Sequence, residues 1–119
     1  MQKINPVDII LHKRSRSLEI QFNNGEQYDL PWEYLRVHSP SSEVRGRRGN
    51  DSILITGKEN VAISDIKPVG NYAVKLFFDD GHHSGLYDWM YLYELGSNYI
   101  QYWQNYLLRI DQESKSRSG

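Results

Sequence analysis

Histidine offers the most versatile chemistry in this chain, and two of its four histidines are adjacent. Because neighbouring residues on a strand point to opposite faces, His82 and His83 can ligate one metal ion only from a turn. A fold that placed His38 beside His82, with Glu43 or Asp80 as a carboxylate, would resemble a facial metal set. The spacing alone favours a simpler interpretation, a polar hairpin tip with solvated imidazoles.

Serine and the basic residues suggest two further kinds of chemistry. Ser39, Ser41 and Ser42 follow His38, but no Gly-x-Ser-x-Gly elbow is present to make one of them a nucleophile, and turn chemistry explains them better. Two basic groups would suit phosphate, yet no RNP-type motif, helix-turn-helix or glycine-rich phosphate loop accompanies them. We therefore expect neither serine catalysis nor nucleic-acid binding. The basic groups are Lys13, Arg14 and Arg16, and Arg45, Arg47 and Arg48.

The composition excludes several classes of protein. The chain has 119 residues, a formal net charge of −1 and no Cys. Without Cys it has no disulfide framework, no thiolate zinc finger, no iron–sulfur cluster of its own and no cysteine nucleophile. No signal peptide is expected, and no stretch approaches the roughly 20 apolar residues that cross a membrane. We expect one cytoplasmic domain, without membrane or nucleic-acid partners.

Alternating apolar and polar residues predict an antiparallel meander in the first third of the chain. The expected strands are residues 7–11, 18–22 and 27–30, because their side chains alternate with a period of two. Asn24-Gly25 lies between the second and third strands and predicts a type I′ hairpin, in which both central residues have positive φ.

The rest of the chain predicts strands followed by helices. Asp88 is expected to cap a helix that Gly96 ends as its C′ residue, and Pro68 indicates a bulge or a sheet edge. The last helix carries an apolar stripe of Tyr99, Ile100, Trp103, Tyr106, Leu107 and Ile110. The elements expected are a helix over 31–38, strands over 61–69, 72–78 and 83–87, and helices over 89–95 and from 97 or 98 to 110.

This order of elements predicts a small α+β domain, mainly antiparallel, with one short helix and a C-terminal amphipathic helix. The domain is expected to cover residues 1–110. Residues 111–119 are polar and are expected to form a frayed tail.

Three segments, in this order, carry a family resemblance. They are LRVHSPSSEVRG at 35–46, IKPVGNYAV at 66–74, and FDDGHHSGLYDW at 78–89, the last followed by Tyr91-Leu92 and Glu94-Leu95-Gly96. Together they resemble the gamma-butyrobetaine hydroxylase-like N-terminal domain family, in its short stand-alone bacterial form. The resemblance extends from about Pro6 to the last helix.

The resemblance implies a supporting role. In the carnitine-biosynthesis dioxygenases such a domain precedes the catalytic domain, binds a structural zinc and supports assembly; in other relatives it is fused to scaffold proteins of iron–sulfur assembly. The iron and 2-oxoglutarate chemistry needs a His-x-Asp motif, which this chain lacks. The resemblance therefore implies a non-enzymatic accessory or protein-interaction module. Its partner would be an oxygenase or an iron–sulfur assembly protein, and homodimerisation through the aromatic last helix stays open.

The resemblance also locates a zinc site. It places the three cysteine ligands of zinc-binding members at Ser39, Ser41 and Val44, and their histidine ligand at His82. Because serine and valine side chains cannot replace thiolates, we expect the structural zinc to be lost and no other cofactor to be bound.

Polar residues are nevertheless expected to gather where the zinc ligands would lie. Arg36, His38 and Ser39 would then meet His82 and its neighbour His83. One interpretation is a vestigial structural network, and the other is a metal or small-ligand site built on His38 and His82, with His82 as the metal candidate.

Overall fold

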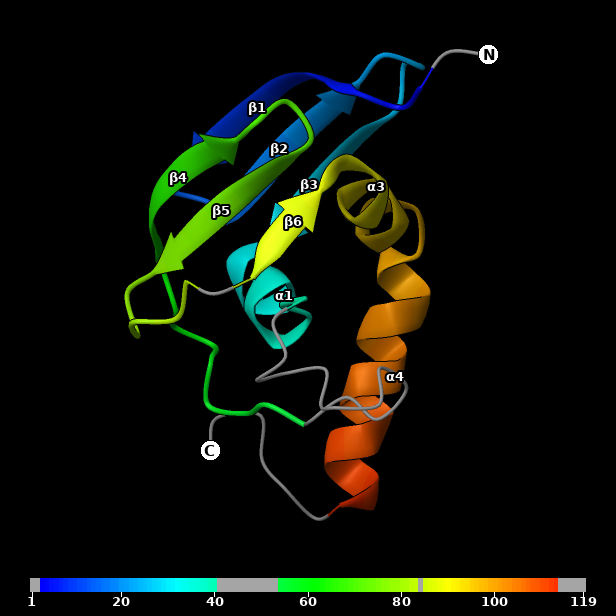
Figure 1. Cartoon of the computed structure of the whole chain (residues 1–119). Helices are drawn as coiled ribbons and strands as arrows, with labels where there is room; N and C mark the ends of the chain where they lie inside the picture. Colours follow the sequence, from blue (N-terminus) through cyan, green and yellow to red (C-terminus); the bar gives the residue numbers. More distant parts are fainter. Residues whose placement is uncertain (1–2, 41–53, 84, 114–119) are drawn as a thin grey trace.

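The computed structural model describes residues 3–40, 54–83 and 85–113. Two three-stranded antiparallel sheets, ordered β1-β2-β3 and β4-β5-β6, lie one over the other, with the helices beside and below them (Figure 1). The predicted α+β class is confirmed. Among the described residues, no helix has the length and apolar character needed to cross a membrane. The elements are β1 (Pro6–His12), β2 (Ser17–Phe22), β3 (Gln27–Pro31), α1 (Trp32–Val37), β4 (Ile63–Val69), β5 (Ala73–Phe78), β6 (Leu86–Asp88), α3 (Trp89–Ser97) and α4 (Tyr99–Gln112).

The first sheet, β1-β2-β3, follows the predicted alternation in β2, whose apolar side chains are all buried while those between them face outward. In β1 the predicted alternation holds only from Ile9, because Ile9 and Leu11 pack against the core whereas Val7 does not. The register with β2 shifts between Pro6 and Asp8, so Val7 lies in a bulge and is 65% exposed.

The β2–β3 hairpin lies where Asn24-Gly25 predicts it, but its turn is not type I′. Gly25 has a φ of 89°, whereas Asn24 is not in the positive-φ region. The Gly25 N–H donates to the Phe22 carbonyl at 3.1 Å, and the Phe22 N–H donates to the Glu26 carbonyl at 2.8 Å. Asn24 Oδ1 accepts the Glu26 N–H at 3.0 Å. These bonds define a three-residue loop, a type I turn followed by a left-handed glycine.

The hairpin after β5 repeats this loop. Gly81 has a φ of 88°, its N–H donates to the Phe78 carbonyl at 3.1 Å, and the Phe78 N–H donates to the His82 carbonyl at 3.0 Å. Asp80 Oδ1 accepts the His82 N–H at 3.1 Å. The predicted return strand is too long, because β6 contains only Leu86–Asp88. His82 and His83 therefore lie in the loop, where the strand rule of opposite faces does not apply.

Pro68 lies on β4, which is an edge strand as predicted; the bulge of this strand is elsewhere, between Ile63 and Asp65. The sequence predicts three helix starts, and those of α1 and α3 lie within one residue of their predicted positions. Pro31 is the N-cap of α1, and Asp88 Oδ1 accepts the Tyr91 N–H at 2.7 Å at the start of α3.

Gly96 was expected as a C′ stop, and that prediction is wrong. Helix α3 continues to Ser97, and Gly96 is buried inside it. A Cβ at this position would overlap Cγ and Cδ2 of Tyr28, which lies on β3. Glycine is therefore present because helix and sheet approach closely, and not because the chain needs a left-handed residue.

The main core lies between the two sheets and is closed by α1 and α3. Tyr34 of α1 is fully buried, and its hydroxyl donates to the Leu95 carbonyl of α3 at 2.7 Å. This bond ties the two helices together inside the core. The core side chains are Leu18, Ile20, Phe22, Leu30, Trp32, Tyr34, Leu35, Val61, Ile63, Val74, Leu76, Phe78, Tyr87, Leu92 and Leu95.

The long helix α4 buries a narrower stripe than predicted. Tyr106 and Ile110 are buried against Val37, but Ile100 and Leu107 are exposed. Helix α4 also continues to Gln112, two residues beyond the predicted end of the domain, and Arg109 pairs with Glu113 at 2.8 Å one turn later. Residues 114–119 of the predicted tail lie outside the described residues.

Candidate functional site at the end of α1

Ser39 and His82 are brought into direct contact. Ser39 follows the end of α1, His82 lies in the loop after β5, and Ser39 Oγ is 2.8 Å from His82 Nε2 in a hydrogen bond. Ser39 is 1% exposed and His82 7% exposed. The two positions that the resemblance pairs as metal ligands are therefore joined by a buried hydrogen bond.

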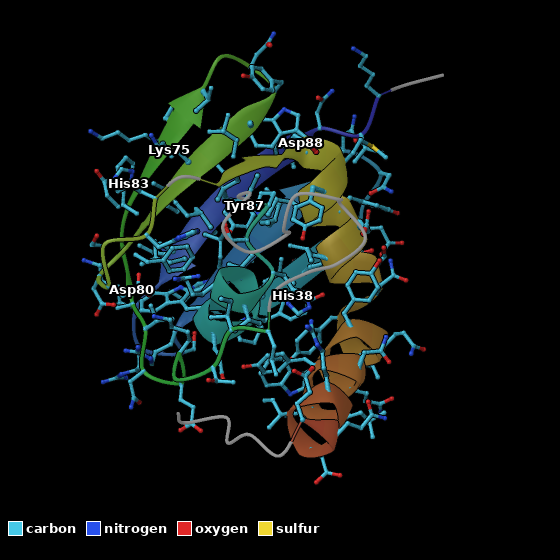
Figure 2. The ribbon with its side chains drawn as sticks, turned by 60° about the horizontal axis from the view of Figure 1, so that its bottom comes forward. His38, Lys75, Asp80, His83, Tyr87 and Asp88 are labelled. Carbon is cyan, nitrogen blue, oxygen red and sulfur yellow. The ribbon has the colours of Figure 1, made fainter. Side chains whose placement is uncertain are left out.

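Asp80 is the charged centre of this junction (Figure 2). Its Oδ2 accepts from Arg36 Nε of α1 at 2.9 Å and from Lys58 Nζ at 2.6 Å, while its Oδ1 accepts the His82 N–H. One carboxylate thus binds α1, the segment before β4 and the β5–β6 loop.

The pKa of Asp80 reflects these contacts. Burial by itself raises the pKa of this carboxyl, but the hydrogen bonds from Lys58, the His82 N–H and Arg36 outweigh it and hold the pKa at about 2. The carboxylate is therefore ionised at neutral pH and neutralises two cations, of which Arg36 is buried.

Arg36 is held by packing as well as by charge. Its guanidinium lies over the Phe78 ring, with Cζ 6.0 Å from the ring centroid. Within the described residues its Nη1 is buried without a hydrogen-bond partner. A buried guanidinium of this kind depends strongly on its one carboxylate, Asp80.

Two tyrosine hydroxyls hold the end of α1 from the other side. Tyr87 donates to the Leu35 carbonyl at 2.7 Å, and Tyr91 donates to the His38 carbonyl at 2.6 Å. Burial raises the pKa of Tyr87, so its hydroxyl stays protonated and donates. These bonds satisfy carbonyl groups that the last turn of a helix leaves without partners.

His38 does not share the neighbours of His82. Its ring stacks on Tyr102 of α4 at 6.0 Å and packs on Tyr34 at 4.6 Å, and its Nδ1 is 2.9 Å from the Tyr34 carbonyl. Burial lowers the pKa of His38. Figure 2 shows His38 on the side of α1 that faces α4, away from Asp80. None of the described contacts joins the two imidazoles, so the structure supplies no His38–His82 pair.

His83 points away from the junction and lies exposed on the second sheet. It stacks on Phe77 at 5.4 Å, and the Lys67 and Lys75 ammonium groups lie over the same ring at 5.5 and 5.6 Å. This surface is separate from the bond between Ser39 and His82.

Several candidate residues of the sequence lie outside the described residues: Ser41, Ser42, Glu43, Val44, Arg45, Arg47 and Arg48. Arg16, a member of the other basic group, has a structural role. Its guanidinium donates to the Asn60 and Val61 carbonyls at 2.6 Å each and lies over Trp32 at 5.1 Å.

Among the residues that the structure describes, the donor set at the junction does not fit a zinc ion. His82 Nε2 is occupied by the hydrogen bond to Ser39, and the nearby carboxylate of Asp80 is already shared by Arg36 and Lys58. A structural zinc site needs four ligands, usually thiolate or imidazole, and two cations beside it oppose a third. In this chain the contact between α1 and the β5–β6 loop is stabilised by hydrogen bonds and by the ion pairs of Asp80.

Ser39→Ala is expected to lower the free energy of unfolding by about 1–2 kcal/mol, because it removes a buried hydrogen bond to His82. Chemical denaturation followed by tryptophan fluorescence measures the loss. The matched control is His83→Ala, which removes an exposed imidazole one residue away and should change stability by less than about 0.5 kcal/mol. Equal losses in the two variants would show that the bond contributes nothing specific.

Comparisons with known proteins found one family model and several solved structures that match this chain. The model of the family described as "Gamma-butyrobetaine hydroxylase-like, N-terminal" matches residues 9–93. Two proteins with solution NMR structures are similar to this chain over 98% of its length, each with a TM-score of 0.84. The first is 46% identical and is covered over 91% of its own length. The second is 50% identical and is covered over 86% of its own length. A crystal structure from Acidithiobacillus ferrooxidans, a protein of unknown function in the DUF971 family, is 36% identical over 77% of this chain and 92% of its own, with a TM-score of 0.66. A search of the curated proteins found no match.

Proposed function

Because the chain belongs to the gamma-butyrobetaine hydroxylase-like N-terminal domain family, we propose that it is a non-enzymatic accessory module that binds a protein partner. The partner that the family suggests is an oxygenase or an iron–sulfur assembly protein. Two features of the molecule support this function, a closed polar junction and an exposed apolar helix face.

The polar junction supports a structural role and not a catalytic one. The Ser39 hydroxyl and the His82 imidazole are almost completely buried, and each satisfies the other. A nucleophile or general base needs access to its substrate, which this burial prevents. The network instead joins α1 to the β5–β6 loop.

The observation that carries the proposal is the exposed face of α4. Ile100 is 71% exposed, Leu107 41% exposed and Leu108 58% exposed, and their spacing of seven and eight residues places the three on adjacent parts of the helix surface. Apolar side chains that gather on one exposed helix face typically mark a protein interface. We define this surface as the α4 face: Ile100, Leu107 and Leu108.

A photo-crosslinking residue at Leu108, expressed in the native host, is expected to capture one major protein at near-stoichiometric yield, because the α4 face is where the partner is proposed to bind. Leu107→Asp in the same chain should abolish this product by placing a charge in an apolar interface. Mass spectrometry of the crosslinked band identifies the partner.

The matched control is the same photo-crosslinking residue placed at position 7, where Val7 is an exposed apolar residue on the first sheet. The proposal requires that Val7 give no such product. If Leu108 and Val7 capture the same mixture, or if Leu107→Asp leaves the Leu108 product unchanged, the α4 face is not the binding surface. Circular dichroism of each variant shows that the fold is intact.

A further inference from the structure

The outer face of the first sheet carries a second group of ligand side chains, separate from the junction at α1. Glu19 on β2 is directly opposite Asp29 on β3, and Ile10 on β1 is opposite Glu19. His12, two residues after Ile10, therefore lies diagonally across from Glu19 on the same face. The core side chains of β2 point the other way, toward the second sheet.

The three side chains converge. His12 Nε2 is 2.8 Å from Glu19 Oε1, and one ligand atom from each of His12, Glu19 and Asp29 lies within 4.8 Å of the others. All three residues lie on paired strands, which fix their backbone positions. We define this group as the sheet triad.

Glu19 is oriented by a neighbour on its own strand. Gln21 Nε2 donates to Glu19 Oε2 at 2.6 Å, which leaves Oε1 directed at His12. A hydrogen bond to the second oxygen of a ligand carboxylate is the usual way in which proteins aim a metal ligand.

The triad brings two carboxylates together. Glu19 and Asp29 are like charges directly opposite each other in a sheet, an arrangement that destabilises strand pairing. In the part of the chain that the structure describes, no lysine or arginine forms an ion pair with Asp29. A divalent cation between the carboxylates would remove this repulsion.

We infer that His12, Glu19 and Asp29 bind one divalent transition-metal ion of the zinc class. One imidazole nitrogen and two carboxylate oxygens are ligands that zinc accepts, and three protein ligands leave a position open for water or for a side chain of a partner. The ion takes the place of the proton shared by His12 and Glu19. Ligand atoms bound to one zinc ion lie about 3.3 Å apart, so the 2.8 Å contact opens slightly while Asp29, which is exposed, rotates inward.

The experiment is a calorimetric titration of the tag-free full chain with zinc chloride. The expected result is one ion per chain, with the affinity reduced about tenfold or more in His12→Ala and in Asp29→Asn. The control is His83→Ala, which removes an exposed imidazole outside the triad and should bind zinc as the unaltered chain does. Asp29→Asn should also raise the Tm of the metal-free protein, because it relieves the repulsion by Glu19, while it abolishes the Tm increase that zinc causes.

Amide NMR spectra of the zinc-bound protein locate the ion independently of these variants. Shift changes confined to β1, β2 and β3 would support the sheet triad. The inference is overturned if the unaltered chain shows no binding at about 0.1 mM zinc, or if His12→Ala binds normally. Binding that is lost only in His82→Ala would also overturn it, and would place the metal at the α1 junction.

Discussion

Asp80→Asn is expected to lower the free energy of unfolding by about 3 kcal/mol, the largest effect of any single polar substitution proposed for this protein. The variant keeps an oxygen that can accept the His82 N–H, so the loop geometry is retained. It removes the charge that neutralises Arg36 and Lys58. The loss is large because Arg36 is buried and has no other carboxylate partner among the described residues.

Denaturant unfolding at several pH values measures this contribution. The folded-state pKa of Asp80 is about 2, below its ordinary value of 3.8. A carboxyl with a lowered folded pKa stabilises the fold fully above its unfolded pKa and loses that contribution as the pH falls through the folded value. The unaltered protein should therefore lose about 2 kcal/mol between pH 4 and pH 2 that Asp80→Asn does not lose.

The matched control for Asp80→Asn is Asp8→Asn, which neutralises an exposed carboxylate on the first sheet. It should change stability by less than about 0.5 kcal/mol and leave the acid profile unchanged. If Asp80→Asn unfolds at the same denaturant concentration as Asp8→Asn, the ion-pair cluster does not hold the junction.

Gly96→Ala is expected to lower the free energy of unfolding by about 2 kcal/mol, the second large effect. In an ordinary exposed helix this change would stabilise by about 1 kcal/mol, because alanine favours helix more than glycine does. Here the added Cβ overlaps the Tyr28 ring near its attachment point, where the ring cannot swing aside. Tyr28 is in turn packed edge-on against Phe22 and Tyr93.

The double variant Gly96→Ala with Tyr28→Ala distinguishes overlap with the Tyr28 ring from a general effect of alanine on α3. In a Tyr28→Ala background the Gly96→Ala change should cost little or should stabilise, since the clashing ring is gone. Thermal unfolding of the four proteins in this cycle gives the coupling between the two positions. A Gly96→Ala protein with a higher Tm than the unaltered chain would contradict the close approach of α3 and β3.

Local patterns predicted the strands well and the helix ends less well. The period-two pattern of β2 and the Asn24-Gly25 hairpin were found where alternation and turn chemistry place them, because both depend on residues close in sequence. Gly96 was misinterpreted for the opposite reason. Its role depends on Tyr28, which is distant in the chain, and a glycine before a polar residue has the same local pattern in either case.

The apolar stripe of α4 shows a second limit of periodicity. Six residues repeat at helical spacing, but only the side facing α1 has a surface to pack on, and Ile100 and Leu107 stay exposed. A helical repeat identifies an amphipathic helix, and it does not show how wide a face the rest of the fold covers.

Part of the candidate site could be predicted from the sequence. The family resemblance singled out Ser39 and His82, and the structure places them in contact. The role of Asp80 as the centre of an ion-pair cluster was not foreseen, because its partners Arg36 and Lys58 come from separate segments. The one local signal is the Asp-Gly pair at 80–81, which predicts a turn but does not indicate the ion-pair partners of Asp80 Oδ2.

The loops after β2 and β5 have the same backbone hydrogen bonds but different charges. Asn24 and Asp80 do the same work for the backbone, each accepting the N–H of the residue two positions later. The second side-chain atom of each residue reaches beyond its own loop: Asn24 Nδ2 donates to the Tyr93 hydroxyl of α3, whereas Asp80 Oδ2 pairs with the cations Arg36 and Lys58. An exchange of carboxylate for amide at position 80 thus removes the ion pairs to Arg36 and Lys58 while the turn keeps an acceptor for the His82 N–H, so the charge of this junction can change without a change in the path of the chain.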